Sequence, residues 1–391
     1  MKQQSFQLVI LLIAIFFITS CSDSESITEK EIEEEVLTDI YVPDPDFKIV
    51  GYLPYYRFSA IPFIEFEKLN YVNISFGNLE SAGNLVVGNG VNIKSIVQNI
   101  KAKGPKVLLS IAGGALSAET KDNWVHYLSD AKRKETIKKM VRFVLTNNLD
   151  GIDVDIEGSL IPLLGSNYNK FVIELKKYLH AEGKAITAAM MPVSLNNAIH
   201  QNAIEAFDFI NIMIYNATGS WDMSNPGQHS SYEFTEEALN FWENVKHIDS
   251  QKLVLGMPFY AFNFDPAVGK SRTYGDIVSE NVNYAYVDSF DQTYYNGIPT
   301  IAKKTELAVN QVNGVMFWEL GQDAFNELSL IKVVDQVLDV YPCSSGEVTI
   351  FYADEDGDGF GNPAKPILAC EQPPNYVNNR TDTDDTDTSI A

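Results

Sequence analysis

Histidine, cysteine and positive charge are all scarce in this chain of 391 residues. It has five histidines and three cysteines, and its 29 lysines and arginines are outnumbered by 52 acids, which gives a formal net charge of −23. The histidines show no spacing typical of a metal site, so we interpret them as surface or structural residues. The negative charge argues strongly against nucleic acid as a partner, because a polyanion repels an acidic protein.

Apolar runs long enough to cross a bilayer are absent as well. The run over residues 8–18 is too short to span a membrane. With Lys2 before it and Thr19-Ser20-Cys21 after it, the run is typical of an export signal. The cysteine at its end resembles the cysteine of a bacterial lipobox, which implies that Cys21 carries a lipid after cleavage. An ordinary signal peptide with an incidental cysteine is the alternative.

Most of the negative charge lies at the two ends of the chain. Residues 22–46 carry ten acids against Lys30, and residues 343–391 carry ten against Lys365 and Arg380, which gives −9 and −8 of the total of −23. A segment as acidic and apolar-poor as 22–46 cannot fold alone, so we expect a tether there. We therefore divide the chain into a signal peptide (1–21), an acidic tether (22–46), a large domain (47–341) and an acidic module (342–391).

The large domain alternates short apolar runs with amphipathic stretches. Strands are predicted over residues 47–53, 69–76, 106–112, 150–157, 185–191, 208–215, 252–259 and 313–318. Helices are predicted over residues 92–103, 121–147, 167–181, 235–247, 300–312 and 323–340. Eight strands in alternation with helices indicate an α/β fold of the (β/α)8 TIM barrel type with a small acidic C-terminal appendage. A doubly wound open sheet is the alternative, but Gly51-Tyr52-Leu53-Pro54 is no phosphate-binding loop.

The fourth predicted strand, Asp150-Gly151-Ile152-Asp153-Val154-Asp155-Ile156-Glu157, carries the chemistry. Side chains alternate between the faces of a strand, so Asp153, Asp155 and Glu157 share one face. Neighbouring, partly buried carboxylates raise one another's pKa values, which produces a general acid near neutral pH. A carboxylate site for calcium or magnesium is the alternative.

These acids reproduce the Asp-x-x-Asp-x-Asp-x-Glu signature and resemble glycoside hydrolase family 18, the chitinases and endo-β-N-acetylglucosaminidases. Four further strand ends resemble the same family over residues 47–340: Ser110-Ile111-Ala112-Gly113-Gly114, Met213-Ile214-Tyr215-Asn216, Gly256-Met257-Pro258-Phe259-Tyr260 and Gly314-Val315-Met316-Phe317-Trp318. Ala112 stands where the family usually has glycine, and Ile156 where many chitinases have tryptophan. We expect the chemistry to tolerate both.

The resemblance implies a retaining mechanism assisted by the substrate, without a cofactor for catalysis. In this scheme Glu157 protonates the glycosidic oxygen and the 2-acetamido group of the sugar attacks the anomeric carbon. Asp155 holds the acetamido N–H, Asp153 shares a proton with Asp155, and Tyr215 donates to the acetamido carbonyl. Asn216 positions sugar hydroxyls and Trp318 forms an apolar floor. Further substrate contacts are expected from Tyr52, Met190, Met213 and Tyr260.

The C-terminal module opens with an acidic loop. Asp354, Asp356 and Asp358, followed by Gly359, have the spacing of a calcium loop, but Lys365 replaces the glutamate that an EF-hand needs. With Asp382 and Asp384 the segment resembles thrombospondin type 3-like repeats, which implies Ca²⁺ binding; a solvated acidic tail is the alternative. In an exported chain, Cys343 and Cys370 are expected to form a disulfide.

The predicted function is a glycoside hydrolase that cleaves β-1,4 linkages of N-acetylglucosamine glycans such as chitin. The alternatives are an endo-β-N-acetylglucosaminidase acting on N-glycans, a sugar-binding relative without activity, and a calcium-dependent surface adhesin. Between Tyr260 and Gly314 the sequence is too short for the extra α+β domain that walls the groove of many chitinases, which predicts an open cleft. We expect a monomeric lipoprotein anchored by lipid at the outer membrane or surface of a Gram-negative bacterium.

Overall fold

The computed structural model describes residues 37–88, 90–268, 270–344, 346–382 and 384–388. The signal peptide, Cys21 and the first part of the predicted tether lie outside these residues. None of the helices in the described ranges has the length and apolarity that crossing a membrane requires.

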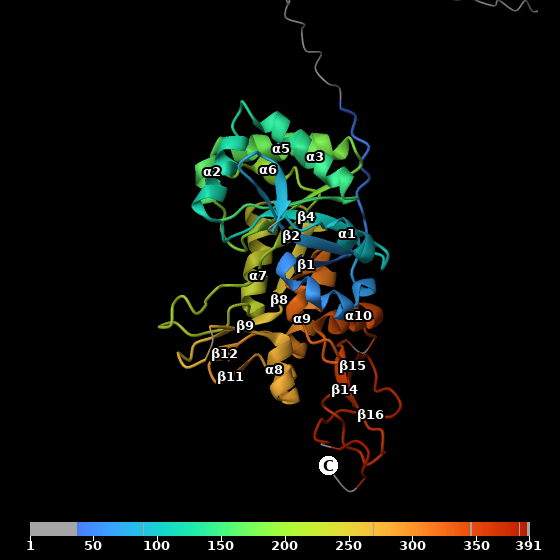
Figure 1. Ribbon diagram of the computed structural model, residues 1–391. Helices are drawn as coiled ribbons and strands as arrows, with labels where there is room; N and C mark the ends of the chain where they lie inside the picture. The colour runs from blue at the N-terminus through green and yellow to red at the C-terminus, as the bar shows by residue number, and fades with distance from the viewer. Residues whose placement is uncertain (1–36, 89, 269, 345, 383, 389–391) are drawn as a thin grey trace, which may run out of the picture. The chain divides into compact units, whose positions relative to one another are not determined.

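A closed barrel of parallel strands forms the centre of the fold (Figure 1). The strand order is β1-β13-β8-β7-β6-β5-β4-β2, and β1 pairs with β2 to close the ring. The prediction of a (β/α)8 barrel is confirmed, and each predicted strand overlaps an observed one. The barrel strands are β1 (Lys48–Pro54), β2 (Tyr71–Leu79), β4 (Lys106–Ala112), β5 (Gly151–Asp155), β6 (Ala185–Met190), β7 (Phe209–Ile212), β8 (Leu253–Pro258) and β13 (Gly314–Trp318).

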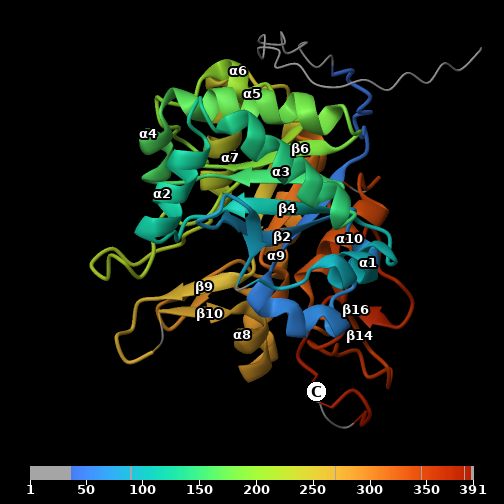
Figure 2. The same cartoon turned by 45° about the horizontal axis from the view of Figure 1, so that its top comes forward.

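Helices surround the barrel, with α2, α3, α5 and α6 on one side and α9 and α10 on another (Figures 1 and 2). The α-helices are α1 (Lys94–Lys101), α2 (Ala118–Tyr127), α3 (Arg133–Thr146), α4 (Leu160–Leu164), α5 (Ser166–His180), α6 (Gln201–Ile204), α7 (Tyr232–Asn240), α8 (Tyr274–Glu280), α9 (Ile298–Gln311) and α10 (Leu330–Val340). The shorter helices are η1 (Tyr55–Phe63), η2 (Phe66–Lys68), the π-helix η3 (Phe241–Val245), η4 (Ser250–Lys252), η5 (Val282–Tyr286) and η6 (Leu320–Gln322). Strand β3 (Leu85–Val87) pairs antiparallel with β2.

The predicted alternation along β5 is observed. Ile152, Val154 and Ile156 belong to the apolar core between strands and helices. A second apolar cluster, which includes Tyr52, Met213 and Met316, fills the inside of the barrel.

The single helix predicted over residues 121–147 is two helices, α2 and α3. Side chains at the break bind carbonyl groups that a continuous helix would need. The Ser129 hydroxyl donates to the His126 carbonyl at 2.7 Å, and Thr136 Oγ1 donates to the Tyr127 carbonyl at 3.0 Å. Serine and threonine compete with helical hydrogen bonds in this way, and periodicity alone does not reveal it.

A small α+β insertion lies between β8 and α9, so the expectation that none would be present is wrong. It contains β9 (Tyr260–Asn263), β10 (Ser271–Thr273), β11 (Ser289–Phe290) and β12 (Thr293–Tyr294), which form one antiparallel sheet, with α8 and η5. In the views of Figures 1 and 2 the sheet and α8 lie in the lower part of the picture, beneath the barrel strands. Its strands are too short to be predicted from alternation.

Residues 37–46 pack against the floor of the barrel, the end formed by the first residues of the strands. Tyr41 stacks on His180 with ring centroids 4.5 Å apart, and Asp39 Oδ2 lies 3.0 Å from His180 Nδ1. Asp44 accepts hydrogen bonds from Lys106 Nζ at 2.6 Å and from the Tyr71 hydroxyl at 3.0 Å. The prediction of a free tether is therefore wrong for residues 37–46, because these contacts compensate for the entropy lost on ordering.

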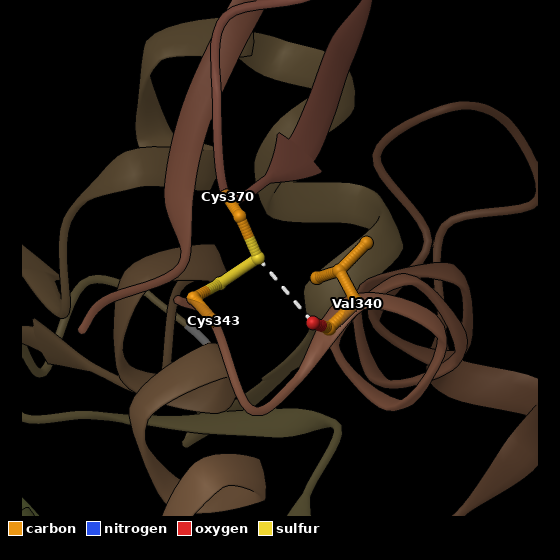
Figure 3. The surroundings of a disulfide bond; sticks show 3 residues. All are labelled: Val340, Cys343 and Cys370. Carbon is orange, nitrogen blue, oxygen red and sulfur yellow. Dashed lines mark hydrogen bonds between the residues drawn. A yellow bond between two sulfur atoms is a disulfide. The ribbon is translucent and has the colours of Figure 1, made fainter. Parts of the chain in front are cut away.

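The C-terminal module is a small antiparallel sheet next to α10, made of β14 (Thr349–Ala353), β15 (Pro366–Ala369) and β16 (Tyr376–Val377). Cys343 and Cys370 form a disulfide, and the sulfur of Cys370 lies 3.3 Å from the carbonyl oxygen of Val340, the last residue of α10 (Figure 3). The Tyr286 hydroxyl of the insertion donates to the Pro363 carbonyl at 2.5 Å. The module thus contacts both α10 and the insertion.

Candidate active site

A pocket of about 720 Å³ opens at the C-terminal ends of the barrel strands. This is the end at which (β/α)8 enzymes place their chemistry, because the loops that follow the strands meet there. The pocket is lined by residues from seven strand ends: Tyr55, Tyr56, Phe76, Asn78, Val86, Gly88, Ala112, Gly113, Gly114, Ala115, Leu116, Ser117, Thr120, Asp155, Glu157, Met213, Tyr215, Asn216, Tyr260 and Trp318.

Asp153 is the deepest acid of β5 and is completely buried. Its carboxylate accepts hydrogen bonds from the hydroxyls of Thr187 at 2.6 Å, Tyr52 at 2.7 Å and Ser110 at 2.8 Å, and from Asn211 Nδ2 at 3.3 Å. Burial raises the pKa of Asp153, while these four donors lower it. Donors on four different strands therefore fix this carboxyl group at the base of the site.

Asp155 and Glu157 stand above Asp153 and border the pocket. Burial raises the pKa of Asp155 well above its usual value, and repulsion from Glu157 and Asp153 raises it further. Burial also raises the pKa of Glu157, opposed by a hydrogen bond to Asp155. The sharing of a proton between Asp155 and Asp153 during the reaction stays a prediction, while Asp155 is hydrogen-bonded to Glu157. The pair therefore retains a proton at a pH at which exposed carboxyl groups have lost theirs.

One carboxylate oxygen of Asp155 lacks a hydrogen-bond donor among the described residues. Asp155 Oδ1 is buried and has no hydrogen-bond partner within the described part of the chain. A buried acceptor without a donor is costly, so such groups are usually satisfied by a ligand or water. This oxygen can therefore accept an N–H from a molecule in the pocket.

Tyr215, Asn216 and Tyr260 form one wall of the pocket. The Tyr260 hydroxyl donates to Asn216 Oδ1 at 2.5 Å, and the rings of Tyr215 and Tyr260 lie edge to face at 6.1 Å. Burial raises the pKa of Tyr215 well above its usual value, and repulsion from Tyr260 adds to the shift. Tyr215 is therefore a neutral hydroxyl that can donate a hydrogen bond to a ligand.

Trp318 and Phe76 provide an apolar surface at the end of β13 and along β2. Their rings are 5.7 Å apart and nearly parallel, with an interplanar angle of 18°. Flat apolar rings of this kind suit the faces of sugar rings. Sequence reasoning included Trp318 but missed Phe76, although an aromatic residue near a strand end was a usable signal.

Two predicted substrate contacts do not line this pocket. Tyr52 is buried inside the barrel, where its hydroxyl holds Asp153. Met190 lines a separate cavity of about 30 Å³ behind Glu157. Tyr52 lies on the inner face of the barrel but below the pocket, whereas Met190 has the same parity as Ile186 and Ala188 and belongs to the core between the strands and the helices. The aromatic residues Tyr55 and Tyr56, which directly follow β1, line the pocket and were missed.

Asp150, the first acid of the signature, lies at the other end of β5. Its carboxylate binds Lys101 Nζ at 2.7 Å and the backbone N–H of Val107 at 2.8 Å. Asp150 thus joins α1, β4 and β5 at the floor and has no contact with the pocket.

The turn after β4 explains why the family favours glycine there. Ala112 has a φ of 75° and Gly113 a φ of 87°. A Cβ on Gly113 would lie 2.8 Å from the Phe76 ring, and one on Gly114 would lie 2.9 Å from Glu157 Oε1. Ala112 is tolerated but strained, because a side chain disfavours left-handed backbone.

The predicted metal ligands of the C-terminal module divide into two groups. Asp354, Asp356 and Asp358 have oxygen atoms within 4.8 Å of one another. Asp382 is buried and its charge acts on Asp356. Asp384 is exposed: its N–H donates to Asp382 Oδ1 at 2.8 Å, and its own carboxylate accepts a hydrogen bond from the Thr386 hydroxyl at 2.6 Å.

Comparison with known proteins gives a consistent result. The family model described as glycosyl hydrolases family 18 matches residues 48–323. The structure is similar to a chitinase from the chitin utilization locus of Flavobacterium johnsoniae, with 39% identity, a TM-score of 0.71, and coverage of 75% of this chain and 94% of that one. It is also similar to a chitinase from Bacteroides thetaiotaomicron, with 29% identity, a TM-score of 0.64, and coverage of 75% and 96%.

Among curated proteins, a secreted chitinase of Penicillium expansum is 27% identical over 250 residues. This match covers 56% of the present chain but only 16% of the fungal protein, which is far longer.

Proposed function

The chain belongs to glycosyl hydrolase family 18, and from this membership we propose that it hydrolyses the β-1,4 linkages of chitin and chitooligosaccharides. The observation that carries the proposal is the pair of Asp155 and Glu157, a proton-retaining acid at the edge of a sugar-sized pocket with aromatic walls. The similarity to two bacterial chitinases supports chitin as the substrate class.

The mechanism assigns each group a step that its position permits. Glu157 protonates the glycosidic oxygen while the acetamido oxygen of the bound sugar attacks the anomeric carbon. The unpaired Oδ1 of Asp155 accepts the acetamido N–H, and the Tyr215 hydroxyl donates to the acetamido carbonyl. Glu157, now ionised, then takes a proton from the water that opens the cyclic intermediate. The configuration is retained, because two successive substitutions at the anomeric carbon each invert it.

Asp153 supports this cycle from below. With four donors its carboxylate is stable in place, and its charge helps to keep the proton on the Asp155–Glu157 pair. When Glu157 gives its proton to the leaving group, Asp155 is left as the negative charge nearest the developing oxazolinium. That arrangement stabilises positive charge where it forms in the transition state.

Mass spectrometry of the products tests this function. Residues 22–391 are incubated with N-acetylglucosamine hexamer and, separately, with a high-mannose glycoprotein, beside the Glu157→Gln variant. We expect shorter chitooligosaccharides from the wild type and none from the variant. Release of N-glycans instead would indicate an endo-β-N-acetylglucosaminidase. Binding of the sugar without any product would indicate a sugar-binding protein. Sugar binding that a chelator abolishes, again without product, would indicate an adhesin.

We further propose that the C-terminal module binds Ca²⁺. The donor set fits this ion, since Asp354, Asp356 and Asp358 are clustered and Asp356 Oδ2 and Asp382 Oδ2 are buried without partners in the described residues. Partial burial and repulsion from the neighbouring carboxylates raise the pKa of Asp356, and a cation would relieve this repulsion. Calorimetric titration with Ca²⁺ should show binding that Asp356→Asn removes; heat that is unchanged in the variant would contradict the site.

The location of the protein is a proposal as well. The export signal and Cys21 support a lipoprotein at the outer membrane or cell surface. The described chain starts next to the barrel floor, where Asp39 and Tyr41 contact His180. A tether that joins the barrel at its floor leaves the pocket, at the opposite end of the strands, accessible to polymer. Palmitate labelling that depends on Cys21 tests the anchor.

A further inference from the structure

Lys304 of α9 is a buried lysine that the proposed mechanism does not use. Its side chain is completely inaccessible to solvent. The ammonium group donates to the Ser230 carbonyl at 2.7 Å, to Ser230 Oγ at 2.8 Å and to Asn296 Oδ1 at 2.9 Å. All three acceptors are neutral oxygen atoms, so no carboxylate is directly bonded to the charge.

Burying a lysine in this way lowers the stability of the fold, so we expect its hydrogen bonds to have a purpose. Removing an ammonium group from water carries a large penalty, and an apolar side chain of similar length would fill the same space without it. An ammonium group has three donors and Lys304 has three acceptors, so the charged form satisfies every bond. Burial lowers the pKa of Lys304 to about 7, because removal from water disfavours the charged form.

Ser230, which binds Lys304, is also hydrogen-bonded to the segment that carries Tyr215 and Asn216. Ser230 Oγ donates to the Ile214 carbonyl at 2.5 Å, and the N–H of Ala217 donates to the His229 carbonyl at 3.0 Å. Residues 214–217, the substrate turn, are thus bonded at both ends to residues 229–230. Tyr215 and Asn216 lie between these two attachments.

His229 fixes the centre of the same turn. The N–H of Asn216 lies 3.5 Å from His229 Nδ1, and His229 Nε2 lies 3.3 Å from the Tyr260 carbonyl, so the proton belongs on Nε2. Asn216 has a φ of 65°, a left-handed conformation that needs support from its surroundings. Its side chain accepts the Tyr260 hydroxyl, so the backbone at Asn216 sets the position of both groups.

We propose that Lys304 is a positioning residue for substrate binding, which holds Tyr215 and Asn216 in place through Ser230 and His229. The inference rests on the proposed function, because Tyr215 and Asn216 are substrate contacts within it. Lys304 itself touches no substrate. Its loss should weaken sugar binding through Asn216 and leave the apolar surface formed by Trp318 at the end of β13 unaffected.

A double-mutant cycle tests this pathway. Lys304→Met is compared with Lys303→Met, the same change on the adjacent, exposed lysine. Affinity for N-acetylglucosamine hexamer is measured by calorimetry in the inactive Glu157→Gln protein, well below the unfolding temperature. We expect Lys304→Met to weaken binding about tenfold, which is about 1.4 kcal/mol, and Lys303→Met to have no effect.

The cycle then separates positioning from loss of stability. In an Asn216→Ala background the effect of Lys304→Met should vanish, whereas in a Trp318→Phe background it should persist in full. A Lys304→Met protein that unfolds more easily but binds normally would overturn the proposal, as would an effect that adds to that of Asn216→Ala. If Lys304→Met does not fold, Ser230→Ala replaces it with the same expectations. If the protein that carries Glu157→Gln alone does not bind the hexamer, the proposed function is contradicted instead.

Discussion

Replacing Asp155 by asparagine should make the protein more stable at alkaline pH and nearly inactive. The pKa of Asp155 is raised in the folded protein by burial and by repulsion from Glu157 and Asp153. The folded state therefore holds this proton more tightly than the unfolded chain, where an aspartate has a pKa of about 3.9. The free energy of unfolding consequently falls as pH rises from that value through the folded-state pKa, and the loss remains at higher pH.

The size of the effect follows from the same contacts. Each unit by which a pKa is raised costs about 1.4 kcal/mol of stability above that pKa. When Asp155 is ionised, its Oδ1 is a buried charged oxygen without a donor, and an unsatisfied buried group costs about 1–3 kcal/mol, more when it is charged. Asparagine removes the charge and keeps the shape, so we expect Asp155→Asn to gain about 1–3 kcal/mol at pH 8 and less at pH 5. Its kcat should fall by about 100-fold or more, because the acetamido group loses its charged partner.

Urea unfolding at pH 8 and pH 5, with hexamer hydrolysis, measures both effects. Asp150→Asn is the matched control, since Asp150 belongs to the same signature but binds Lys101 and the Val107 N–H at the floor. It should lose about 1 kcal/mol and keep its kcat. An Asp155→Asn protein that is less stable than the wild type at pH 8, or equally active, would refute this reasoning.

Two further changes test parts of the fold. Ala112→Gly should stabilise the barrel by about 1 kcal/mol, because alanine at a φ of 75° is strained and glycine is not; urea unfolding that shows a loss would contradict this. His180 lies between Asp208 and Asp39, and although burial opposes it, their hydrogen bonds raise its pKa. Its stabilising contribution is complete below about pH 6.5 and is lost as pH rises through the folded-state pKa. His180→Gln should therefore be less stable than the wild type at pH 6, with a gap that narrows by pH 9; a constant gap would contradict the assignment.

The barrel and its acids could be predicted because both follow local rules. Strand alternation placed Asp153, Asp155 and Glu157 inside the barrel, and the order of strands and helices determined the closed sheet. What alternation does not determine is depth along a strand. Tyr52 is on the inner face of the barrel but lies below the pocket. Met190 belongs to the core outside the barrel, behind Glu157.

Tertiary contacts account for the remaining differences. Residues 37–46 look unable to fold alone, and they are ordered only because the barrel floor offers Lys106, Tyr71 and His180 as partners. The insertion after β8 was missed because β11 and β12 have two residues each. Lys304 was missed because a lysine within a helical pattern is expected on the surface, and only its burial shows its contacts.

The central claim is that the substrate's acetamido group displaces the leaving group that Glu157 protonates. Proton NMR during hydrolysis of N-acetylglucosamine hexamer tests it most directly, because the anomeric configuration of the first product is visible before mutarotation. Double displacement predicts that the β-anomer forms first. Initial formation of the α-anomer would mean direct attack by water and would contradict the account.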